Sequence, residues 1–434
     1  MKKVLVLGAG LVAGPLVRYL LDDAGFRVTV ASRTEKKAQG LVDGHRNGAP
    51  LGFDITEDGN LLDLLLEHDL VVSLLPYTHH VHVAEGAIKA GIPMVTTSYV
   101  SDAMRELGPK AEDAGIMLLN EMGLDPGIDH MEAQRVIDEV KVNGGEVEGF
   151  ISYCGGLPAP EANDNPWGYK FSWSPKGVVL ASRNPARFRR NGDVIEIPGK
   201  ELFAGYELIE VPGLPVFEGY PNRDSVPYAS VYGIEEAKTV LRGTLRNRGW
   251  CDTWKGLHDI GYLEDGPVIG ETYLDVMEGL APGGGPLKER ITDRIDTRDD
   301  GLVLENWKWL GLLSDLRLLD RTSRLDALSR LLESRLRYSP GERDMIVLQH
   351  RFSCRFKGKK EEVFSTMIDY GIPGGDSAMS RTVGIPAAIG SEMILNGNLK
   401  GHSGVLIPTL PDIYKLALRK LEGKGIRFES GVSI

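Results

Sequence analysis

A glycine-rich turn near the start of the chain has the residue types and spacing that bind the phosphates of a dinucleotide. Gly8, Gly10 and Ala13 follow the apolar run 4–7 and lead into a helix-like segment. The first glycine allows a tight turn, the second lets the backbone approach a pyrophosphate, and the small third residue permits close packing of helix on strand. The N–H groups at the start of that helix face the phosphates. We therefore predict a dinucleotide-binding turn.

The residues at the end of the next apolar run indicate which dinucleotide binds. Sites for NAD usually place Asp or Glu there, on the ribose 2′-hydroxyl. Here the run 28–31 is followed by Ser32, Arg33 and Thr34. Because a guanidinium and two hydroxyls suit a 2′-phosphate, the sequence predicts NADP as the cofactor.

A polar segment, 120–130, leaves the sixth predicted strand and enters a helix. Asp125 in this segment could accept a hydrogen bond from a substrate amine, and the amides of the turn at Gly127 could hold the cofactor. A structural interpretation stays open beside this one. Pro-Gly forms a turn, and Asp125 or Asp129 would then cap the following helix.

Two further kinds of segment carry candidate substrate contacts. The segment 152–174 reads as a long polar and aromatic loop, and such loops are usually functional or disordered. Its Cys154 is either an active-site group or a small buried hydrophobe. Arg223 and Arg246 lie in two other loops rich in Gly, Pro and aromatic residues. Since arginine binds carboxylates in a bidentate manner, a substrate with several carboxylates would use more than one.

Other familiar sites are not predicted. The histidines His79, His80 and His82 have no carboxylate or Cys partner at ligand spacing, so we expect capping and surface roles and no metal. Neither a G-x-S-x-G nucleophile turn nor a Walker A sequence is present in the printed chain.

The elements that must position these residues follow from the spacing of apolar runs. Short runs at 4–7, 51–54, 70–75, 94–97 and 116–119 alternate with helix-like segments, which predicts a parallel sheet with helices on both faces. Ligands of such sheets bind beyond the carboxyl ends of the strands. The residues placed there are Pro76, Ser98, Tyr99 and the segment 121–129.

From about residue 146 the pattern changes to strands and loops, which indicates a second α/β domain with an open or mixed sheet. Leucines at helical spacing (325, 328, 332 and 336) predict a small α-helical insertion. The run 346–356 then returns to strand alternation, with a hairpin turn at 357–359. We expect a dinucleotide-binding domain at 1–124, a second domain at 125–250 and 341–394, an insertion at 251–340, and a segment 395–434 that packs back on the first domain.

Composition restricts the class of protein. The chain has 434 residues, 42% of them hydrophobic and 26% charged, which is typical of a soluble globular protein of about two or three domains. A formal charge of −11 argues against a nucleic-acid partner. Three cysteines without paired spacing predict a reducing compartment, and no apolar run is long enough for a membrane span or a signal peptide. We therefore expect a cytoplasmic protein that does not bind membranes.

In these segments the chain resembles the saccharopine reductases, which are the NADP-dependent, glutamate-forming saccharopine dehydrogenases of lysine metabolism. The resemblance covers nearly the whole chain and is carried by the segments 95–101, 120–130, 152–161, 168–174, 220–225 and 242–246. It implies an N-terminal Rossmann domain, a substrate-binding and dimerisation domain with a mixed sheet, a helical insertion, and a homodimer.

The resemblance also implies roles for particular residues. Cofactor contacts are expected from Gly8, Gly10, Leu11, Val12, Ala13, Ser32, Arg33, Thr34, Asp54, Ile55, Leu75, Pro76, Asp125, Gly127 and Ser174. Contacts to saccharopine are expected from Ser98, Tyr99, Asp125, Arg223, Thr244, Leu245 and Arg246. The implied reaction is hydride transfer at a secondary amine through an imine, with Tyr99 and Asp125 orienting and protonating the nitrogen and Cys154 as a further acid or base.

Two other functions remain open at this point. The chain could join a different amine to an aldehyde, as the related carboxynorspermidine dehydrogenases do with a diamine. A polyamine site would favour acidic residues over the arginines present here. Alternatively, the chain could be a non-catalytic NADPH-binding protein that keeps the fold. Substrate panels and cofactor binding without turnover separate these cases.

Overall fold

The computed structural model describes residues 1–57 and 61–433. These residues form two compact units. The first unit consists of Met1–Gly144 and Gly375–Glu429, and the second of Gly145–Gly374 and Ser430–Ile434. Within the described residues, no helix is long and apolar enough to cross a membrane.

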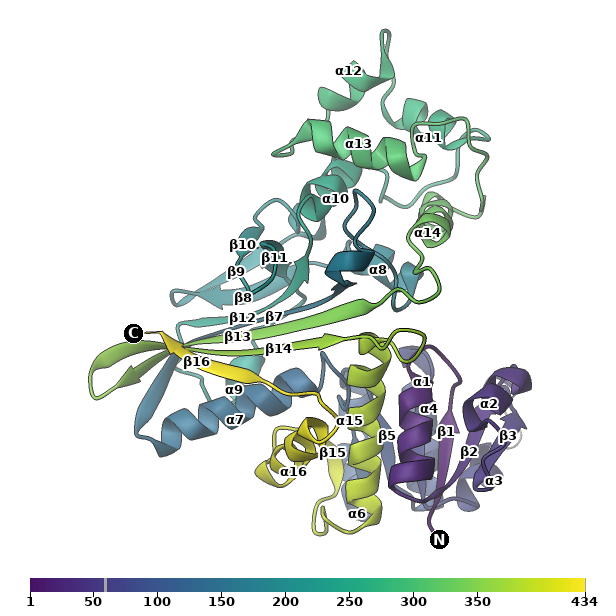
Figure 1. Ribbon diagram of the computed structural model, residues 1–434, viewed down its shortest axis with the longest axis vertical. Coiled ribbons are helices and arrows are strands. Elements are labelled where there is room, and N and C mark those ends of the chain that lie inside the picture. Colours follow the sequence, from purple (N-terminus) through teal and green to yellow (C-terminus); the bar gives the residue numbers. More distant parts are fainter. Residues whose placement is uncertain (58–60, 434) are drawn as a thin grey trace. The chain divides into compact units, whose positions relative to one another are not determined.

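The first unit is built on a parallel sheet of seven strands, in the order β15-β6-β5-β4-β1-β2-β3 (Figure 1). The predicted parallel sheet is confirmed, because every neighbouring pair in it runs parallel. Continuous apolar runs such as Val4–Leu7 are buried because helices cover both faces. The bounds are β1 (Lys3–Leu7), β2 (Arg27–Ser32), β3 (Gly48–Gly52), β4 (Leu70–Ser73), β5 (Met94–Thr96), β6 (Met117–Leu119) and β15 (Gly404–Leu406).

The helices of this unit pack on the sheet in two groups. One apolar core joins residues of β1, β4, β5 and β6 to the helical residues Leu65, Val83, Ala87, Met104 and Ala111. On α15, a Cβ at Gly384 would lie 2.6 Å from the carbonyl oxygen of Val12, so that helix packs tightly against the start of α1. The bounds are α1 (Ala13–Arg18), α2 (Glu35–Val42), α3 (Leu61–Leu66), α4 (His80–Ala90), α5 (Asp102–Arg105), α6 (Gly108–Asp113), α7 (Ile128–Val142), α15 (Ala378–Leu395) and α16 (Pro411–Glu422).

The compact units divide the chain at other positions than the domains expected from the sequence. Helices α7 and α15 fold with the first unit, although the segments 125–250 and 341–394 were expected to form the second domain. The reason is packing: α15 contacts α1, and α16 contacts both α7 and α15. An apolar helix face does not specify its partner in the sequence. The C-terminal segment also adds β15 to the sheet, beside β6.

The second unit contains a mixed sheet, in the order β10-β11-β12-β7-β13-β14-β16, with β8 and β9 joined to it beside β12. The pair β12–β7 is parallel, whereas β10–β11, β11–β12, β7–β13 and β13–β14 are antiparallel. The predicted mixed sheet is therefore confirmed. The bounds are β7 (Gly145–Pro158), β8 (Ala186–Arg190), β9 (Asp193–Ile197), β10 (Glu207–Ile209), β11 (Phe217–Pro221), β12 (Thr239–Arg246), β13 (Asp344–Phe356), β14 (Lys359–Tyr370) and β16 (Glu429–Ser433).

One sequence expectation in this unit is wrong. The segment 152–174 is not a continuous loop, because its first seven residues, 152–158, form the end of β7. This strand pairs with β12 on one side and β13 on the other, so its polar backbone groups are satisfied in a central position of the sheet. The prediction was wrong because this part of β7 contains glycines and polar residues, a composition that is typical of loops. The remainder of the segment is irregular except for the short helix η3 (Pro160–Ala162).

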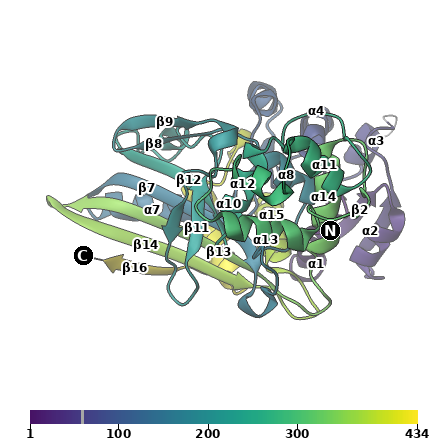
Figure 2. The same ribbon diagram turned by 90° about the horizontal axis from the view of Figure 1, so that it is seen from above.

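The predicted hairpin and helical insertion are confirmed. Strands β13 and β14 pair in register up to Phe356 and Lys359, and the turn residues Lys357 and Gly358 both have positive φ, as a two-residue hairpin requires. The helical part gathers in one cluster (Figures 1 and 2), with buried Trp167, Trp254 and Trp307 in its core. Its helices are α10 (Trp250–Asp259), α11 (Tyr273–Leu280), α12 (Leu287–Thr292), α13 (Asp300–Leu310) and α14 (Arg324–Arg335). Helix α8 (Pro175–Ala181) packs against α14 and adds Val178 and Val179 to the same core, whereas the four-residue α9 (Tyr228–Val231) contributes no residue to it.

Candidate active site

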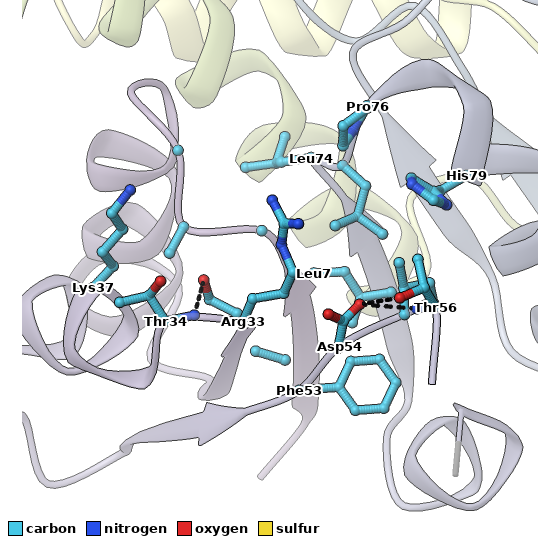
Figure 3. A pocket seen from close by; sticks show the side chains of 17 residues that line it. Leu7, Arg33, Thr34, Lys37, Phe53, Asp54, Thr56, Leu74, Pro76 and His79 are labelled. Atoms are coloured by element: carbon cyan, nitrogen blue, oxygen red, sulfur yellow. Dashed lines mark hydrogen bonds between the residues drawn. The ribbon is translucent and has the colours of Figure 1, made fainter. Parts of the chain in front are cut away.

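A cavity of about 360 Å³ lies in the first unit, at the carboxyl ends of β1 to β4 (Figure 3). Nine of the predicted cofactor contacts line it: Gly8, Gly10, Ser32, Arg33, Thr34, Asp54, Ile55, Leu75 and Pro76. The predicted contacts Leu11, Val12, Ala13, Asp125 and Gly127 belong to the same unit but do not line this cavity, and Ser174 belongs to the second unit. The structure thus brings together the residues that follow four different strands.

The glycine turn has the local geometry that a pyrophosphate needs. Gly8 has a φ of +112°, and a Cβ there would lie 2.9 Å from the carbonyl oxygen of Leu74. Only glycine fits this position without displacing the neighbouring loop. A Cβ at Gly10 would meet no atom within 4 Å, so the backbone at Gly10 borders open space. Helix α1 begins three residues later, at Ala13.

The polar end of the cavity carries two cations. Arg33 and Lys37 both line it and are exposed, and within the part of the chain that the structure describes neither makes an ion pair (Figure 3). The neighbouring Ser32 Oγ accepts a hydrogen bond from the Thr34 N–H at 3.3 Å. Sequence reasoning found Arg33 but missed Lys37. Its spacing supplied a signal, because Lys37 stands one helical turn beyond Thr34, at the start of α2.

Asp54 lies on the same cavity without neutralising its cations. Its Oδ1 accepts hydrogen bonds from the N–H and hydroxyl of Thr56 at 3.0 and 2.8 Å. These hydrogen bonds, with a smaller contribution from Arg33, hold the pKa of Asp54 below its usual range. Asp54 therefore stays charged, and its carboxylate is occupied by the hydrogen bonds from Thr56.

Tyr99 and Asp125 come together from two different loops of the first unit. Tyr99 follows β5 and Asp125 follows β6. The Tyr99 hydroxyl donates to Asp125 Oδ1 at 2.7 Å. The two residues that were expected to orient and protonate a substrate nitrogen are thus in direct contact. The capping alternative is met in part for α7: the N-cap residue Gly127 has no side chain to cap the helix, but Asp129 Oδ1 accepts from the Gly127 N–H at 2.6 Å.

His80 is a buried hydrogen-bonding residue, which corrects the expected capping or surface role. It is 5% exposed, with Nδ1 2.9 Å from Ser73 Oγ and Nε2 2.8 Å from Ser98 Oγ. It therefore joins the end of β4 to the predicted substrate contact Ser98. Burial, with a smaller effect of His79, lowers the pKa of His80 to about 4. No cluster of metal-ligating side chains occurs among the described residues.

The depressed pKa of His80 predicts a pH-dependent loss of stability. Below the ordinary pKa of about 6.5 the unfolded chain binds a proton that the folded chain refuses until about pH 4, so stability falls as the pH falls through this window. We expect acidification from about pH 7 to about pH 5 to cost the wild-type protein about 2 kcal/mol more than His80→Gln. Urea unfolding of both proteins at the two pH values measures this difference.

The same comparison contains its own control. The pKa of His258 is also lowered by burial, but His258 is present in both proteins and its contribution cancels. An identical pH dependence of wild type and His80→Gln would show that His80 takes up its proton as readily in the folded as in the unfolded chain.

In the second unit, two of the predicted substrate contacts, Thr244 and Arg246, lie on the same face of β12. In β7, β12 and β11 the register places Cys154 opposite Thr244, and Thr244 opposite Tyr220. Arg246 lies two residues beyond Thr244 in β12 and hence on the same face. Leu245 points to the other face, into the core formed with Tyr153 and Leu157. A ligand on the Thr244 face could therefore reach only the backbone of Leu245.

Arg246 is a buried cation in an aromatic enclosure. It is 6% exposed, and its guanidinium carbon lies 5.0 Å from the ring centre of Tyr169 and 5.2 Å from that of Trp250. Its Nη1 donates to the Leu245 carbonyl at 2.8 Å. Within residues 1–57 and 61–433, its Nε has no hydrogen-bond partner, and the groups that interact electrostatically with it are tyrosines and cysteines and include no carboxylate. A buried guanidinium of this kind lacks the anion that would normally compensate its charge.

The remaining predicted residues have less defined settings. Arg223 lies beyond the end of β11, is exposed, and has a φ of +54°. Cys154 is a buried thiol in β7 that forms no disulfide within the described residues, and it interacts electrostatically with Arg246. Ser174 is exposed and caps α8, with its Oγ accepting from the Gly177 N–H at 3.2 Å. The aromatic partners Tyr169 and Trp250 were not singled out from the sequence, because their proximity to Arg246 arises only in the fold.

Family models match both parts of the chain. A model of the saccharopine dehydrogenase NADP binding domain matches residues 4–119, and a model of the saccharopine dehydrogenase C-terminal domain matches residues 123–426. The chain is 42% identical to saccharopine dehydrogenase (NADP(+), L-glutamate-forming) of Pyricularia oryzae, over 98% of this chain and 97% of that protein. It is 39% identical to the mitochondrial alpha-aminoadipic semialdehyde synthase of Mus musculus, over 100% of this chain but 48% of that protein.

Solved structures give the same picture. Apo saccharopine dehydrogenase (L-Glu forming) from Saccharomyces cerevisiae superposes with a TM-score of 0.92 at 40% identity, covering 100% of both chains. The homospermidine synthase of Legionella pneumophila has a TM-score of 0.60 at 10% identity, over 100% of this chain and 91% of that one. The second likeness concerns the fold alone.

Proposed function

The chain belongs to the saccharopine dehydrogenase family, and from this premise we propose that it is the NADP-dependent, L-glutamate-forming enzyme. It interconverts saccharopine with L-glutamate and 2-aminoadipate 6-semialdehyde. The observation that carries this proposal is the match along the whole chain, at about 40% identity, to enzymes of that name. The cavity geometry and the buried Arg246 support it independently.

The reaction balances as an oxidation followed by a hydrolysis. Saccharopine loses a hydride from the carbon that becomes the aldehyde and a proton from its secondary amine, which leaves a carbon–nitrogen double bond. Water then adds to that carbon, and the carbon–nitrogen bond breaks to release L-glutamate and the semialdehyde. The reverse direction forms the imine from the two products and reduces it. Proton transfers at nitrogen accompany both steps, because the amine loses a proton when the imine forms and the nitrogen gains protons before the carbon–nitrogen bond breaks, and neither step requires a metal.

The residues around the first-unit cavity fit an NADP molecule. Gly8 and Gly10 leave room for the pyrophosphate, and the exposed cations Arg33 and Lys37 suit the 2′-phosphate. When bound, NADP accepts or supplies the hydride. The backbone amides after β1 and the side chains after β2 hold and orient the cofactor, while Asp54 remains tied to Thr56.

We assign the proton transfer at nitrogen to the Tyr99–Asp125 pair. The Tyr99 hydroxyl already donates to the carboxylate at 2.7 Å, so a proton released by the amine can be taken up by a group held in place. Cys154 is retained as a further acid or base. Ser98 contacts the substrate with its hydroxyl, which His80 holds.

We assign the binding of substrate carboxylates to Arg246 and Arg223, with Thr244 beside them. Arg246 supports this assignment best, since it is buried and has no carboxylate of the chain as a partner within the described residues. A substrate carboxylate supplies the missing charge and accepts two parallel hydrogen bonds from the guanidinium fork. A diamine substrate, as in the carboxynorspermidine alternative, would bring a second cation to Arg246.

A direct assay tests the proposed function. Purified protein mixed with saccharopine and NADP⁺ is expected to produce the absorbance of reduced nicotinamide, and the same mixture with NAD⁺ much less. Glutamate with the semialdehyde and NADPH is expected to run the reaction in reverse. Turnover of a diamine in place of glutamate would support the carboxynorspermidine alternative. Tight NADPH binding without turnover of either pair would support the non-catalytic one.

We further propose a homodimer in a reducing compartment, the cytoplasm. The second unit supports a dimer through a groove of about 700 Å³, lined by apolar side chains such as Leu208 and Phe364 together with charged ones such as Glu207 and Arg351. The three cysteines support the compartment, since all are buried and none forms a disulfide within the described residues. Light scattering on a sizing column is expected to give twice the chain mass of 47.5 kDa, and a monomer mass contradicts the dimer. Fractionation of cells of the source organism tests the compartment.

A further inference from the structure

A buried carboxylate, Glu121, connects the two loops that carry the Tyr99–Asp125 pair. Glu121 Oε1 accepts a hydrogen bond from the Val100 N–H at 2.9 Å, next to Tyr99 in the chain. Its Oε2 lies 2.7 Å from Nε2 of His130, in the first turn of α7. Glu121 is 5% exposed and His130 is fully buried. One side chain thus fixes the loop after β5 to the start of α7.

The backbone of the same residue adds a second connection between the loops. The Glu121 N–H donates to the Ser98 carbonyl at 3.2 Å, and the Met122 N–H donates to the Thr96 carbonyl at 3.0 Å. The loop after β6 therefore lies against the loop after β5 over several residues. Both the side chain and the backbone of Glu121 therefore hold the loop after β6 against the loop after β5.

The conformation of Glu121 indicates that its side chain compensates a local cost. Its φ is +59°, in the left-handed region that a residue with a Cβ adopts at a cost of about 1 to 3 kcal/mol. Glycine or asparagine would suit this backbone position better. A glutamate at this position keeps the unfavourable free energy of the left-handed conformation, and the two contacts of its carboxylate offset that free energy.

Further along, His130 is itself held in place. Its Nδ1 lies 3.6 Å from Asp129 Oδ2, and Asp129 Oδ1 accepts from the Gly127 N–H at 2.6 Å. The chain of contacts therefore runs from Val100 through Glu121, His130 and Asp129 to Gly127. Asp125 lies within the loop that this chain of contacts closes.

We propose that Glu121, acting with His130, is a positioning residue that holds the Tyr99 hydroxyl on Asp125 for proton transfer at the substrate nitrogen. This inference rests on the proposed function. Neither Glu121 nor His130 touches the substrate in it. The physical reason is distance: the two reacting side chains belong to separate loops, and a displacement of about 1 Å at such a pair can cost up to about 100-fold in rate.

A matched control lies in the same unit. Glu132 is 2% exposed and pairs with Arg135 at 2.6 Å within helix α7. Removing its charge should affect stability as a buried ion pair does, whereas the Tyr99–Asp125 contact should stay intact. The pair Glu121→Gln and Glu132→Gln therefore separates positioning from general stability.

The test measures saccharopine oxidation by the full-length protein with NADP⁺. We expect Glu121→Gln to lower kcat by about 10- to 100-fold, with KM for saccharopine within about 3-fold and the Kd for NADP⁺ unchanged. Glu132→Gln is expected to keep kcat within about 2-fold. In a Tyr99→Phe background, where the hydroxyl is already gone, Glu121→Gln is expected to lower kcat by less than about 2-fold more.

The proposal is overturned if Glu121→Gln lowers kcat by the same factor with and without the Tyr99 hydroxyl, or if both glutamine variants lose activity in proportion to their melting temperatures. A structural readout does not depend on activity. In a crystal structure of Glu121→Ala, or of Glu121→Gln if the alanine variant does not fold, the Tyr99–Asp125 distance is expected to exceed about 3.5 Å.

An unchanged distance of 2.7 Å in that crystal structure contradicts the proposal. If wild-type protein does not oxidise saccharopine at all, the proposed function fails, while the distance in the variant still decides whether Glu121 holds the pair.

Discussion

Replacing Arg246 by glutamine is expected to lower kcat/KM for saccharopine by about 100- to 1000-fold, which corresponds to about 3 to 4 kcal/mol. Hydrogen bonds to charged groups contribute about 1.5 to 3 kcal/mol each, and the guanidinium fork makes two of them to one carboxylate. Because Arg246 is buried against Tyr169 and Trp250, solvent does not screen this interaction. Initial rates over a range of saccharopine concentrations measure the loss.

A more conservative variant, Arg246→Lys, keeps the positive charge but loses the planar guanidinium group. It is expected to retain more activity than glutamine and less than arginine. Arg248→Gln is the matched control, because Arg248 follows two residues later and is exposed. Binding of NADP⁺ should be unchanged in all three proteins, since the cofactor cavity is built from the first unit. Equal losses in Arg246→Gln and Arg248→Gln would remove Arg246 from the carboxylate site.

Arg33→Ala is expected to weaken NADPH binding by about 100-fold and NADH binding by less than about 3-fold, because only NADPH carries the 2′-phosphate. Lys37→Ala should have a smaller effect in the same direction, about 5-fold, since a lysine acts as a point charge without the bidentate fork. Both cations line the cavity beside Thr34 and lack an ion pair within the described residues. Fluorescence titration at one fixed ionic strength gives the four affinities.

Lys36→Ala controls for net charge in this experiment. Lys36 is exposed on the same helix, α2, but does not line the cavity. If Arg33→Ala weakens NADPH and NADH equally, the 2′-phosphate lies elsewhere. If Lys36→Ala matches Lys37→Ala, Lys37 acts only through long-range attraction, which salt should then screen.

The sequence was most informative where local chemistry and periodicity coincide. The glycine turn, Arg33 and the run of strands in the first 119 residues could be predicted, because a buried parallel strand needs a continuous apolar run and a pyrophosphate needs glycine. The hairpin at Lys357 and Gly358 was predicted for the same reason: its turn residues have a strong local preference. The leucines of α14 likewise follow helical spacing, and Leu328 and Leu332 are buried.

Local patterns failed where partners come from distant parts of the chain. The end of β7 has the composition of a loop, and only its pairing with β12 and β13 shows that its glycines and polar residues belong to a strand. His80 reads as a surface residue, because nothing in the neighbouring sequence announces the hydroxyls of Ser73 and Ser98. The helix α15 joins the first unit from more than 200 residues away, although only the segment 395–434, which contains β15, is expected there from the sequence.

The sequence by itself therefore determined the kind of cofactor and the family of the reaction, through residue types that a phosphate or a carboxylate demands. Only the tertiary structure decided which of these residues act together. It placed Tyr99 on Asp125, enclosed Arg246 between Tyr169 and Trp250, and joined both loops of the first unit through Glu121. The physical reason is that hydrogen bonds and buried charges depend on distances of a few ångströms, which chain folding sets and sequence spacing does not record.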